Sequence, residues 1–484
     1  MIEREQLRGL RVGIVGAARE GLALTRYLLA SGARVTLSDT KPAEALGEGV
    51  AALADRGAQL VLGGAPLDLG GLEVLFLSPG VPPTAPVVRE ARERGLPLSS
   101  EPRLFTQVCR APVVGITGSA GKTTTTALVG HMLEQAGLRT WVGGNIGMAL
   151  TERLLDPQGP DVAVMELSSF QLELFSPAYQ GEAVEARRSA ASRVLSLEGW
   201  SPRIAAVTNI TPNHLDRHPS MEDYARAKAN IVAYQTPDDW AVLNADDARS
   251  HALAGEARGR VLRFSLGGAV AEGGYRRGEG LYLRLDGRER MLCTTEQVLL
   301  RGAHNLANVL AAACCASAVG VPPEAMGEAI RAFRGVPHRL EVVREEGGVT
   351  WVNDSIATSP ERVLAALRAY REPLVLLAGG RDKHLPWEEW ADLVLERVRT
   401  VIAFGEAAPI ITAALEAARQ RRGLQNGEGS GLEVVATLEE AVGAAARCAR
   451  SGDVVLLSPG GTSFDAYADF EARGRAFRDL VRGL

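Results

Sequence analysis

The 484-residue sequence has only four lysines, Lys41, Lys122, Lys228 and Lys383, so 49 of its 53 basic residues are arginine. Arginine replaces lysine wherever a solvated positive charge is enough, but only lysine offers a compact ammonium or a primary amine. For any single lysine, chance retention in an arginine-rich sequence is the simpler interpretation. The four therefore indicate functional sites only if they coincide with other motifs.

Other absences narrow the class of protein. No apolar run reaches the roughly 20 residues of a membrane-spanning helix, and the N-terminus lacks the charged-then-apolar pattern of a signal peptide. The five cysteines are odd in number and form no C-x-x-C pair, which favours neither a disulfide framework nor a zinc site. A net charge of −5 is unlike that of nucleic-acid-binding proteins. We expect a cytoplasmic protein without nucleic-acid or membrane partners.

Short β-branched runs alternate with helical stretches, which is typical of parallel α/β sheets. The pattern predicts three domains: a Rossmann-like domain (1–108), a central P-loop ATPase-like parallel sheet domain (109–336) and a Rossmann-like C-terminal domain (337–484). Joints are expected at Arg103–Pro112 and Gly335–His338, where a proline interrupts weak periodicity. The expected strands are Val12–Val15, Val35–Leu37, Val74–Leu77, Val113–Ile116, Val162–Met165, Ile204–Val207, Leu374–Leu377, Val401–Phe404 and Val454–Leu457.

Two segments of the central region depart from this rhythm. Gly259–Leu300 has glycine-rich turns between short strands and is expected to be a small β excursion. Gln180–Ser201 is rich in Glu, Ala, Arg and Ser, which predicts a polar surface insertion for which a helix is one option.

A phosphate-binding loop is expected between the strand at Val113–Ile116 and a helix that opens at Lys122. The turn Gly118-Ser119-Ala120-Gly121 lets backbone N–H groups converge on phosphate oxygens, and the helix N-terminus adds partial positive charge. Lys122 would reach the β- and γ-phosphates of ATP, and the Thr123 hydroxyl would hold Mg²⁺. The glycine spacing differs from the general G-x-x-x-x-G-K-[ST] pattern, because Ile116 stands where that pattern has its first glycine.

Candidate metal ligands follow two further strands. Glu166 ends the apolar run Val162–Met165, and His214 and Asp216 follow Ile204–Val207, on the edge of the sheet where ligands bind. Lys228 lies in the helical stretch after His214. A lysine can form a carbamate with CO₂ and so become an anionic metal ligand, but taken alone this residue fits a solvated helix face better.

Together these motifs resemble the Mur ligases, which add amino acids to the peptidoglycan precursor. The resemblance runs nearly the whole chain, and its motifs at 78–83 and in the C-terminal region are most similar to those of the members that add D-glutamate. It is carried by residues 115–123, 166–173, 209–216, 302–309 and 338–341, with 78–83, 353–358, 457–465 and 470–474 as further matches.

The resemblance implies an ATP-dependent amide ligase with Mg²⁺, two ions being expected. It implies a catalytic set of Lys122, Glu166, His214 and Lys228, with a carbamylated Lys228. It implies metal ligation by Thr123, Glu166, His214 and Lys228. The implied ATP-binding residues are Gly118, Ser119, Ala120, Gly121, Lys122, Thr123, Thr124, Asn305, Asn308, Arg339 and Asp354.

The resemblance also implies where two further substrates bind, UDP-N-acetylmuramoyl-L-alanine and D-glutamate, on a monomeric enzyme. Asn145 would face the muramoyl group near the phosphates, and Lys383, Thr358, Ser463 and Phe470 would form the glutamate pocket. The other implied substrate-binding residues are Asp39, Thr40, Lys41, Ser78, Pro79, Gly80 and Ser168.

Three alternatives stay open from the sequence. A sister ligase would add a different amino acid. An NAD-dependent oxidoreductase is suggested by Val12–Gly21 followed by Asp39, although Ala18 replaces the middle glycine of the dinucleotide fingerprint. A P-loop switch or motor protein would not need the amino-acid pocket.

Overall fold

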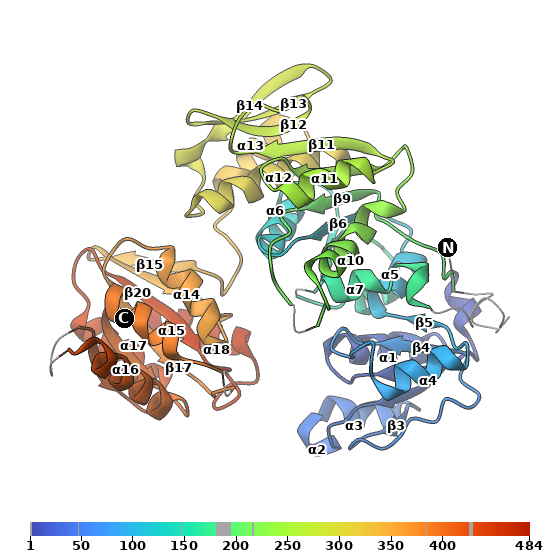
Figure 1. Cartoon of the computed structure of the whole chain (residues 1–484), viewed down its shortest axis with the longest axis horizontal. Helices are drawn as coiled ribbons and strands as arrows, with labels where there is room; N and C mark the ends of the chain where they lie inside the picture. The colour runs from blue at the N-terminus through green and yellow to red at the C-terminus, as the bar shows by residue number, and fades with distance from the viewer. Residues whose placement is uncertain are drawn as a thin grey trace. The chain divides into compact units, whose positions relative to one another are not determined.

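The computed structural model describes residues 2–46, 48–145, 147–180, 195–214, 217–383, 385–424 and 429–484. The chain forms two compact units, which are shown together in Figure 1. One contains Met1–Val298 with Ala303–Phe333, and the other Leu299–Gly302 with Arg334–Leu484. Two sheets lie in the first unit and one in the second, so the predicted α/β class with three sheets is confirmed. The domain limit at 108/109 stays a prediction.

The first sheet is parallel and doubly wound, and its strand order reverses between β1 and β4. Ligands of such sheets bind at the carboxyl ends of the strands near this reversal. In order, the strands are β3 (Gln59–Val61), β2 (Arg34–Ser38), β1 (Arg11–Val15), β4 (Val74–Leu77) and β5 (Leu98–Ser99). The helices are α1 (Arg19–Ala30), α2 (Ala43–Leu46), α3 (Glu48–Asp55), α4 (Pro86–Glu93) and α5 (Glu101–Val108).

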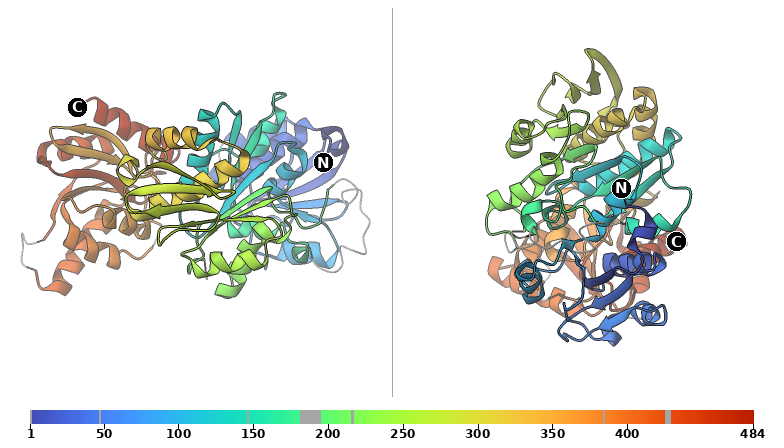
Figure 2. Two further views of the ribbon diagram at one scale, coloured as in Figure 1. Left: turned by 90° about the horizontal axis from the view of Figure 1, so that it is seen from above. Right: turned by 90° about the vertical axis from the view of Figure 1, so that its right-hand side faces the viewer.

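The central sheet has nine strands, and those at its middle are buried on both faces, as parallel sheets require. The predicted β excursion is part of this sheet, because its strands continue from β10 (Figure 2). Only its last two pairings, β12–β13 and β13–β14, are antiparallel. The order is β14 (Arg288–Thr294), β13 (Gly280–Leu285), β12 (Gly273–Arg277), β11 (Arg260–Ser265), β10 (Trp240–Asn244), β9 (Ile204–Val207), β6 (Val113–Thr117), β8 (Val162–Glu166) and β7 (Thr140–Gly144).

Helices cover both faces of the central sheet. One layer consists of α6 (Lys122–Gln135), α12 (Ala303–Val319) and α13 (Pro323–Ala332), which pack on one another and on the strands. Residues of α7 (Ser169–Glu173), α10 (Met221–Ala233) and the segment after α11 (Ala248–Ala252) share a core with the opposite face of the sheet. The sheet edge that carries the predicted site residues therefore lies between two helical layers.

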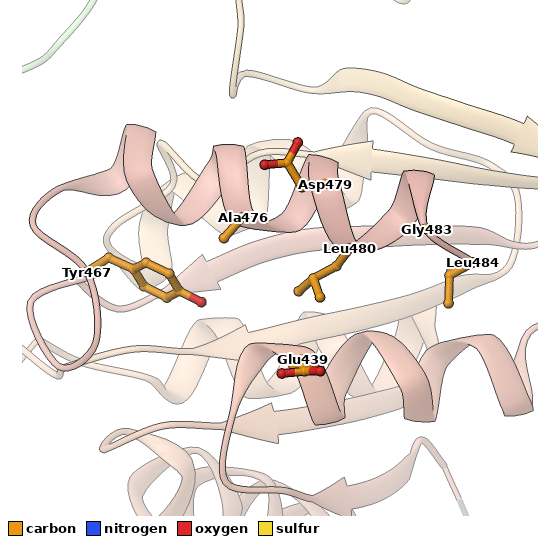
Figure 3. A pocket seen from close by; sticks show the side chains of 7 residues that line it. All are labelled: Glu439, Tyr467, Ala476, Asp479, Leu480, Gly483 and Leu484. Carbon is orange, nitrogen blue, oxygen red and sulfur yellow. The ribbon is translucent and has the colours of Figure 1, made fainter.

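The second unit is a mixed sheet with one antiparallel edge pair, β15–β16. Its order is β15 (Glu341–Glu346), β16 (Val349–Asn353), β20 (Val454–Gly460), β17 (Leu374–Gly379), β18 (Val398–Phe404) and β19 (Gly431–Val434). Its helices are α14 (Pro360–Arg368), α15 (Glu388–Arg397), α16 (Ala408–Arg422), α17 (Leu438–Cys448) and α18 (Phe470–Arg482). A hollow between α17 and α18, lined by Glu439, Tyr467 and Leu480 among others, contains none of the predicted site residues (Figure 3).

Two sequence-based expectations need correction. The first half of Arg103–Pro112, where weak periodicity was expected, is helical, because α5 continues to Val108 and buries the Arg103 side chain; a domain joint in this segment stays a prediction. The predicted insertion at Gln180–Ser201 lies mostly outside the described residues, at 181–194. Of the described residues, Gln180 and Leu195 are buried rather than on a polar surface, because Gln180 hydrogen-bonds both backbone groups of Leu98 and Leu195 joins the core of the first sheet, whereas Ser196 and Glu198 are exposed.

None of the helices in the described residues has both the length and the apolar content that crossing a membrane requires.

Candidate active site

Four neighbouring strands of the central sheet end where the predicted ATP site lies. The loop after β6 carries Gly118, β8 ends in Glu166, β7 leads to Asn145, and Thr208 follows β9. Carboxyl ends of parallel strands meet at one edge of a sheet, so residues far apart in sequence come together here.

The phosphate loop requires glycine at two positions. Gly118 has φ +151° and Gly121 has φ +84°, a backbone region that side chains disfavour. A Cβ on Gly118 would lie 1.9 Å from the Thr208 Oγ1, and one on Gly121 would lie 2.3 Å from the Asn308 Oδ1. At Gly118 and Gly121 the loop therefore packs too closely against its neighbours for any residue other than glycine.

Side chains from two other segments hold this loop in place. Asn209 Oδ1 accepts from the Ala120 N–H at 2.9 Å, while its Nδ2 donates to the Ala120 carbonyl at 3.1 Å. Asn308 receives a 3.4 Å hydrogen bond from Thr125 and donates to Asn305. The pair Asn305 and Asn308, predicted to bind ATP, thus lies at the loop, whereas Asn209 was quoted as a motif residue without a role.

Glu166 is the centre of the predicted metal site. Its side chain is buried, and its Oε2 accepts from the Thr123 hydroxyl at 2.9 Å. Its Oε1 accepts from the Asn145 amide at 2.8 Å, a contact that was not predicted, since Asn145 was expected to face the substrate. Carboxylate and hydroxyl oxygens are the donors that Mg²⁺ prefers, so Thr123 and Glu166 fit this ion.

Lys122 and Lys228 converge on one oxygen atom. The Nζ of each donates to the Gly118 carbonyl at 2.9 Å, and Lys122 also donates to the Ser119 carbonyl. Lys228 is 1% exposed, so the expectation of a solvated helix-face lysine is wrong. Burial, and next the charge of Lys122, lower the pKa of Lys228 well below its usual value, although Glu166 opposes this shift. Burial at the phosphate loop thus favours the neutral form of this amine over the ammonium.

His214 lies on the exposed loop after β9 with φ +53°, and its ring centroid is 5.1 Å from that of Phe170. Asp216 lies outside the described residues. In the parts of the chain that are described, no three His, Cys, Asp or Glu side chains gather as a metal site. Ligation by His214 stays a prediction.

The predicted nucleotide residues lie at the carboxyl ends of the first sheet. Both oxygens of Asp39 accept backbone N–H groups, from Ala17 at 2.7 Å and from Lys41 at 2.9 Å. In a dinucleotide-binding enzyme an acidic side chain here would hold a ribose, whereas this one orders the loop after β1. Ser78, after β4, donates to the Gly16 carbonyl, and open space lies above Gly80.

In the second unit the predicted residues again follow adjacent strands. The Lys383 Nζ donates to the Thr358 hydroxyl at 3.4 Å, which places these two glutamate-pocket residues together. The Phe470 backbone carbonyl accepts from Ser355, and Ser463 is buried in the loop after β20. The positions of all four are therefore described, while their contacts with a substrate stay predictions.

Arg473 was missed as a site residue although it lies within a quoted motif. Its fully buried guanidinium donates to the backbone carbonyls of Gly461, Thr462 and Ser355 and to the Ser355 hydroxyl. It thereby ties the loop after β16 to the loop after β20. Burial lowers its pKa to about 10, so it stays charged at neutral pH.

Arg339 and Asp354 are the predicted ATP residues of this unit. Arg339 is exposed and stands between two residues with left-handed backbone, His338 (φ +64°) and Leu340 (φ +45°). Asp354 is buried and accepts from the Ser458 hydroxyl at 2.8 Å and the Leu340 N–H at 3.2 Å. Burial nevertheless raises the pKa of Asp354 from 3.8 to about 7.

This raised pKa predicts a pH-dependent stability. The folded protein holds the Asp354 proton more tightly than the unfolded chain, so the contribution to stability is complete below the unfolded pKa and is lost as pH rises towards 7. We expect the loss to be roughly 4 kcal/mol at most. Urea unfolding at intervals from pH 4 to 8 checks this expectation: Asp354→Asn should flatten the slope, and an unchanged slope would contradict it.

Comparisons with known proteins agree with this geometry. Residues 116–181 and 178–316 match the Mur ligase middle domain, and residues 338–461 match the Mur ligase glutamate ligase domain. The chain is 44% identical to the UDP-N-acetylmuramoylalanine–D-glutamate ligase of Symbiobacterium thermophilum, with 98% of each chain covered. It is 40% identical to that of Pelotomaculum thermopropionicum, also with 98% of each covered.

Solved structures support the fold at lower identity. UDP-N-acetylmuramate–alanine ligase from Thermotoga maritima superposes with a TM-score of 0.56 at 18% identity, covering 98% of this chain and 99% of the other. MurF from Acinetobacter baumannii gives 0.55 at 17% identity, covering 98% and 93%. With full-length relatives far above 30% identity, the chain belongs to the Mur ligase family and, within it, groups with the UDP-N-acetylmuramoylalanine–D-glutamate ligases.

Proposed function

We propose that this chain joins the amine of D-glutamate to the carboxyl group of UDP-N-acetylmuramoyl-L-alanine, with ATP converted to ADP and phosphate. The observation that carries the proposal is the full-length similarity to ligases of this name together with a phosphate loop that has Thr123 and Glu166 at its side. Residues 1–108, 109–336 and 337–484 are the proposed nucleotide-substrate, ATP and amino-acid domains. We further propose a cytoplasmic monomer.

The first step is transfer of the γ-phosphoryl group of ATP. An oxygen of the substrate carboxylate attacks the γ-phosphorus, the bond to the bridging oxygen breaks, and ADP leaves. The Lys122 ammonium can turn from the loop carbonyls to the β- and γ-phosphates, and backbone N–H groups of the loop hold them. The product is an acyl phosphate, whose phosphate is the leaving group that a carboxylate lacks.

The second step forms the amide. The neutral amine of D-glutamate attacks the acyl carbon, the C–O bond to phosphate breaks, and the nitrogen loses a proton. Thr358, Lys383, Ser463 and Phe470 are the residues proposed to hold the amino acid. Its two carboxylates need positive charge, which Lys383 supplies.

Magnesium completes the proposal. Thr123, Glu166, His214 and Lys228 are the residues that would hold it, as two ions. The ions would neutralise charge on the phosphates and the attacking carboxylate. For Lys228 to be a ligand, its neutral Nζ must attack CO₂ and release a proton, which leaves a carbamate anion. Its burial against Lys122 and Gly118 supports this step, because it favours the neutral amine.

A phosphate-release assay tests the function. The enzyme is given ATP, Mg²⁺ and UDP-N-acetylmuramoyl-L-alanine with D-glutamate, L-glutamate, glycine, L-lysine or meso-diaminopimelate. D-Glutamate should give the fastest release, with the amide product confirmed by mass spectrometry. Faster release with another amino acid would contradict the proposal and point to a sister ligase.

A further inference from the structure

The helix α1 belongs to the domain proposed to bind the nucleotide substrate. Two residues of its first turn, Arg19 and Glu20, contact segments on both sides of Glu166. On one side, Arg19 donates from Nη1 to the Gly147 carbonyl at 2.6 Å and from Nη2 to the Gly144 carbonyl at 3.1 Å. These carbonyls flank Asn145, whose amide holds Glu166 Oε1 at 2.8 Å. One guanidinium therefore fixes the segment that orients one oxygen of the carboxylate.

On the other side, the contact runs through Gln171. The buried Glu20 accepts from Gln171 Nε2 at 2.7 Å. The other end of the same amide, Oε1, accepts from the Ser168 N–H at 2.9 Å and hydroxyl at 3.0 Å. Ser168 is the N-cap of α7 and stands two residues after Glu166. Glu20 thus holds the amide that caps the helix next to the carboxylate.

Other contacts pack the two sheets of this unit together, so the contacts of Arg19 and Glu20 are not needed for that packing. Arg26, on the same helix, forms an ion pair with Glu152, and Glu101 accepts two hydrogen bonds from Thr151. Those contacts join the sheets without reaching the strand ends at Glu166. The contacts of Arg19 and Glu20 differ. Arg19 holds the backbone beside Asn145, which contacts Glu166 itself. Glu20 holds Gln171, which contacts Ser168 beside Glu166.

We propose that Arg19 and Glu20 are positioning residues for Glu166, so that the nucleotide-binding domain helps to build the magnesium site of the ATP-binding domain. The inference rests on the proposed function. Such contacts hold the Glu166 carboxylate in one orientation before the metal ion binds. Loss of supporting contacts around a metal ligand typically lowers metal affinity roughly 10–100-fold.

The chemistry of Glu20 supplies a conservative variant. Burial, and next the charge of Glu101, raise the pKa of Glu20 to about 8, against the opposing effects of Arg19 and Gln171. A side chain that is mostly protonated at neutral pH is well replaced by glutamine, whose carbonyl can still accept from Gln171. Leucine has a similar volume but no acceptor.

Manganese binding tests the inference without turnover. Free Mn²⁺ is measured by electron paramagnetic resonance in titrations with a non-hydrolysable ATP analogue, in the absence of the UDP substrate. We expect Arg19→Ala and Glu20→Leu to weaken Mn²⁺ binding at least roughly 10-fold, with Glu20→Gln near wild type and Arg19→Lys between. Arg26→Ala is the matched control, and it should stay within about twofold of wild type.

The outcomes separate the inference from the proposed function. If wild type binds Mn²⁺ with the analogue but Arg19→Ala and Glu20→Leu do not differ from it, the inference is wrong and the proposed function stands. If Arg26→Ala weakens Mn²⁺ binding equally, the inference is also wrong, because the effect would then come from looser packing between the two sheets. Wild type that neither binds the Mn²⁺–analogue complex nor releases phosphate would overturn the proposed function itself. Thermal unfolding of every variant excludes misfolding, and Arg19→Gln replaces Arg19→Ala should that variant not fold.

Discussion

Replacing Lys122 with alanine is expected to lower kcat by about 10²–10³-fold, the typical cost of removing one donor that stabilises transition-state charge. The Nζ of Lys122 is held at the phosphate loop by the Gly118 and Ser119 carbonyls, from which it can turn to the phosphates. Lys122→Arg should restore little activity, because the planar guanidinium is too large for the place of a compact ammonium. Single-turnover release of phosphate measures the effect on chemistry.

A matched control separates this role from loss of charge in general. Arg226→Ala removes a cation from the exposed face of α10, where Arg226 pairs only with Asp223 among the ion pairs of the described residues. Its activity should stay within about twofold of wild type. Activity of Lys122→Ala at the level of this control would mean that the loop does not bind the transferred phosphoryl group.

Local patterns were enough to predict the framework of the site. The strand at Val113–Ile116 and the helix opening at Lys122 are present with a difference of one residue at the strand end. They were predictable because a buried β-branched run, a glycine turn and a helix N-terminus are all local features. By contrast, the edge strand β7, with two glycines among its five residues, was not among the expected strands, and the hydrogen bond from Asn145 to Glu166 was not predicted; a contact of Asn145 with the substrate stays a prediction.

Contacts between distant segments could not be predicted in this way. Nothing in the sequence near Lys228 shows that its amine reaches the Gly118 carbonyl, 110 residues earlier, because that depends on how α10 packs on β6. The same holds for Arg473, whose acceptors lie in two loops. In both cases the cation has polar residues close to it in the sequence, so neither its burial nor its partners could be predicted without the fold.

Carbamylation of Lys228 leads to the second large prediction. Wild-type enzyme equilibrated with ¹³C-bicarbonate should show a carbamate resonance in its ¹³C spectrum, and Lys228→Arg should not. A guanidinium cannot become an anionic ligand, so kcat of Lys228→Arg should fall at least roughly 100-fold, in line with several kcal/mol of lost metal assistance. Removing CO₂ from the buffer should lower wild-type activity, and added bicarbonate should restore it.

The control is Lys383, a second lysine whose pKa is lowered by burial. Lys383→Arg should keep both the carbamate resonance and the dependence on bicarbonate, while it raises KM for D-glutamate. A resonance that disappears in Lys383→Arg but persists in Lys228→Arg would assign the carbamate to Lys383 and contradict the prediction. Wild-type activity that does not respond to CO₂, together with an active Lys228→Arg, would exclude the carbamate altogether. The amine buried at Gly118 would then serve only to brace the phosphate loop, a role that leaves unexplained why two lysines share one carbonyl oxygen.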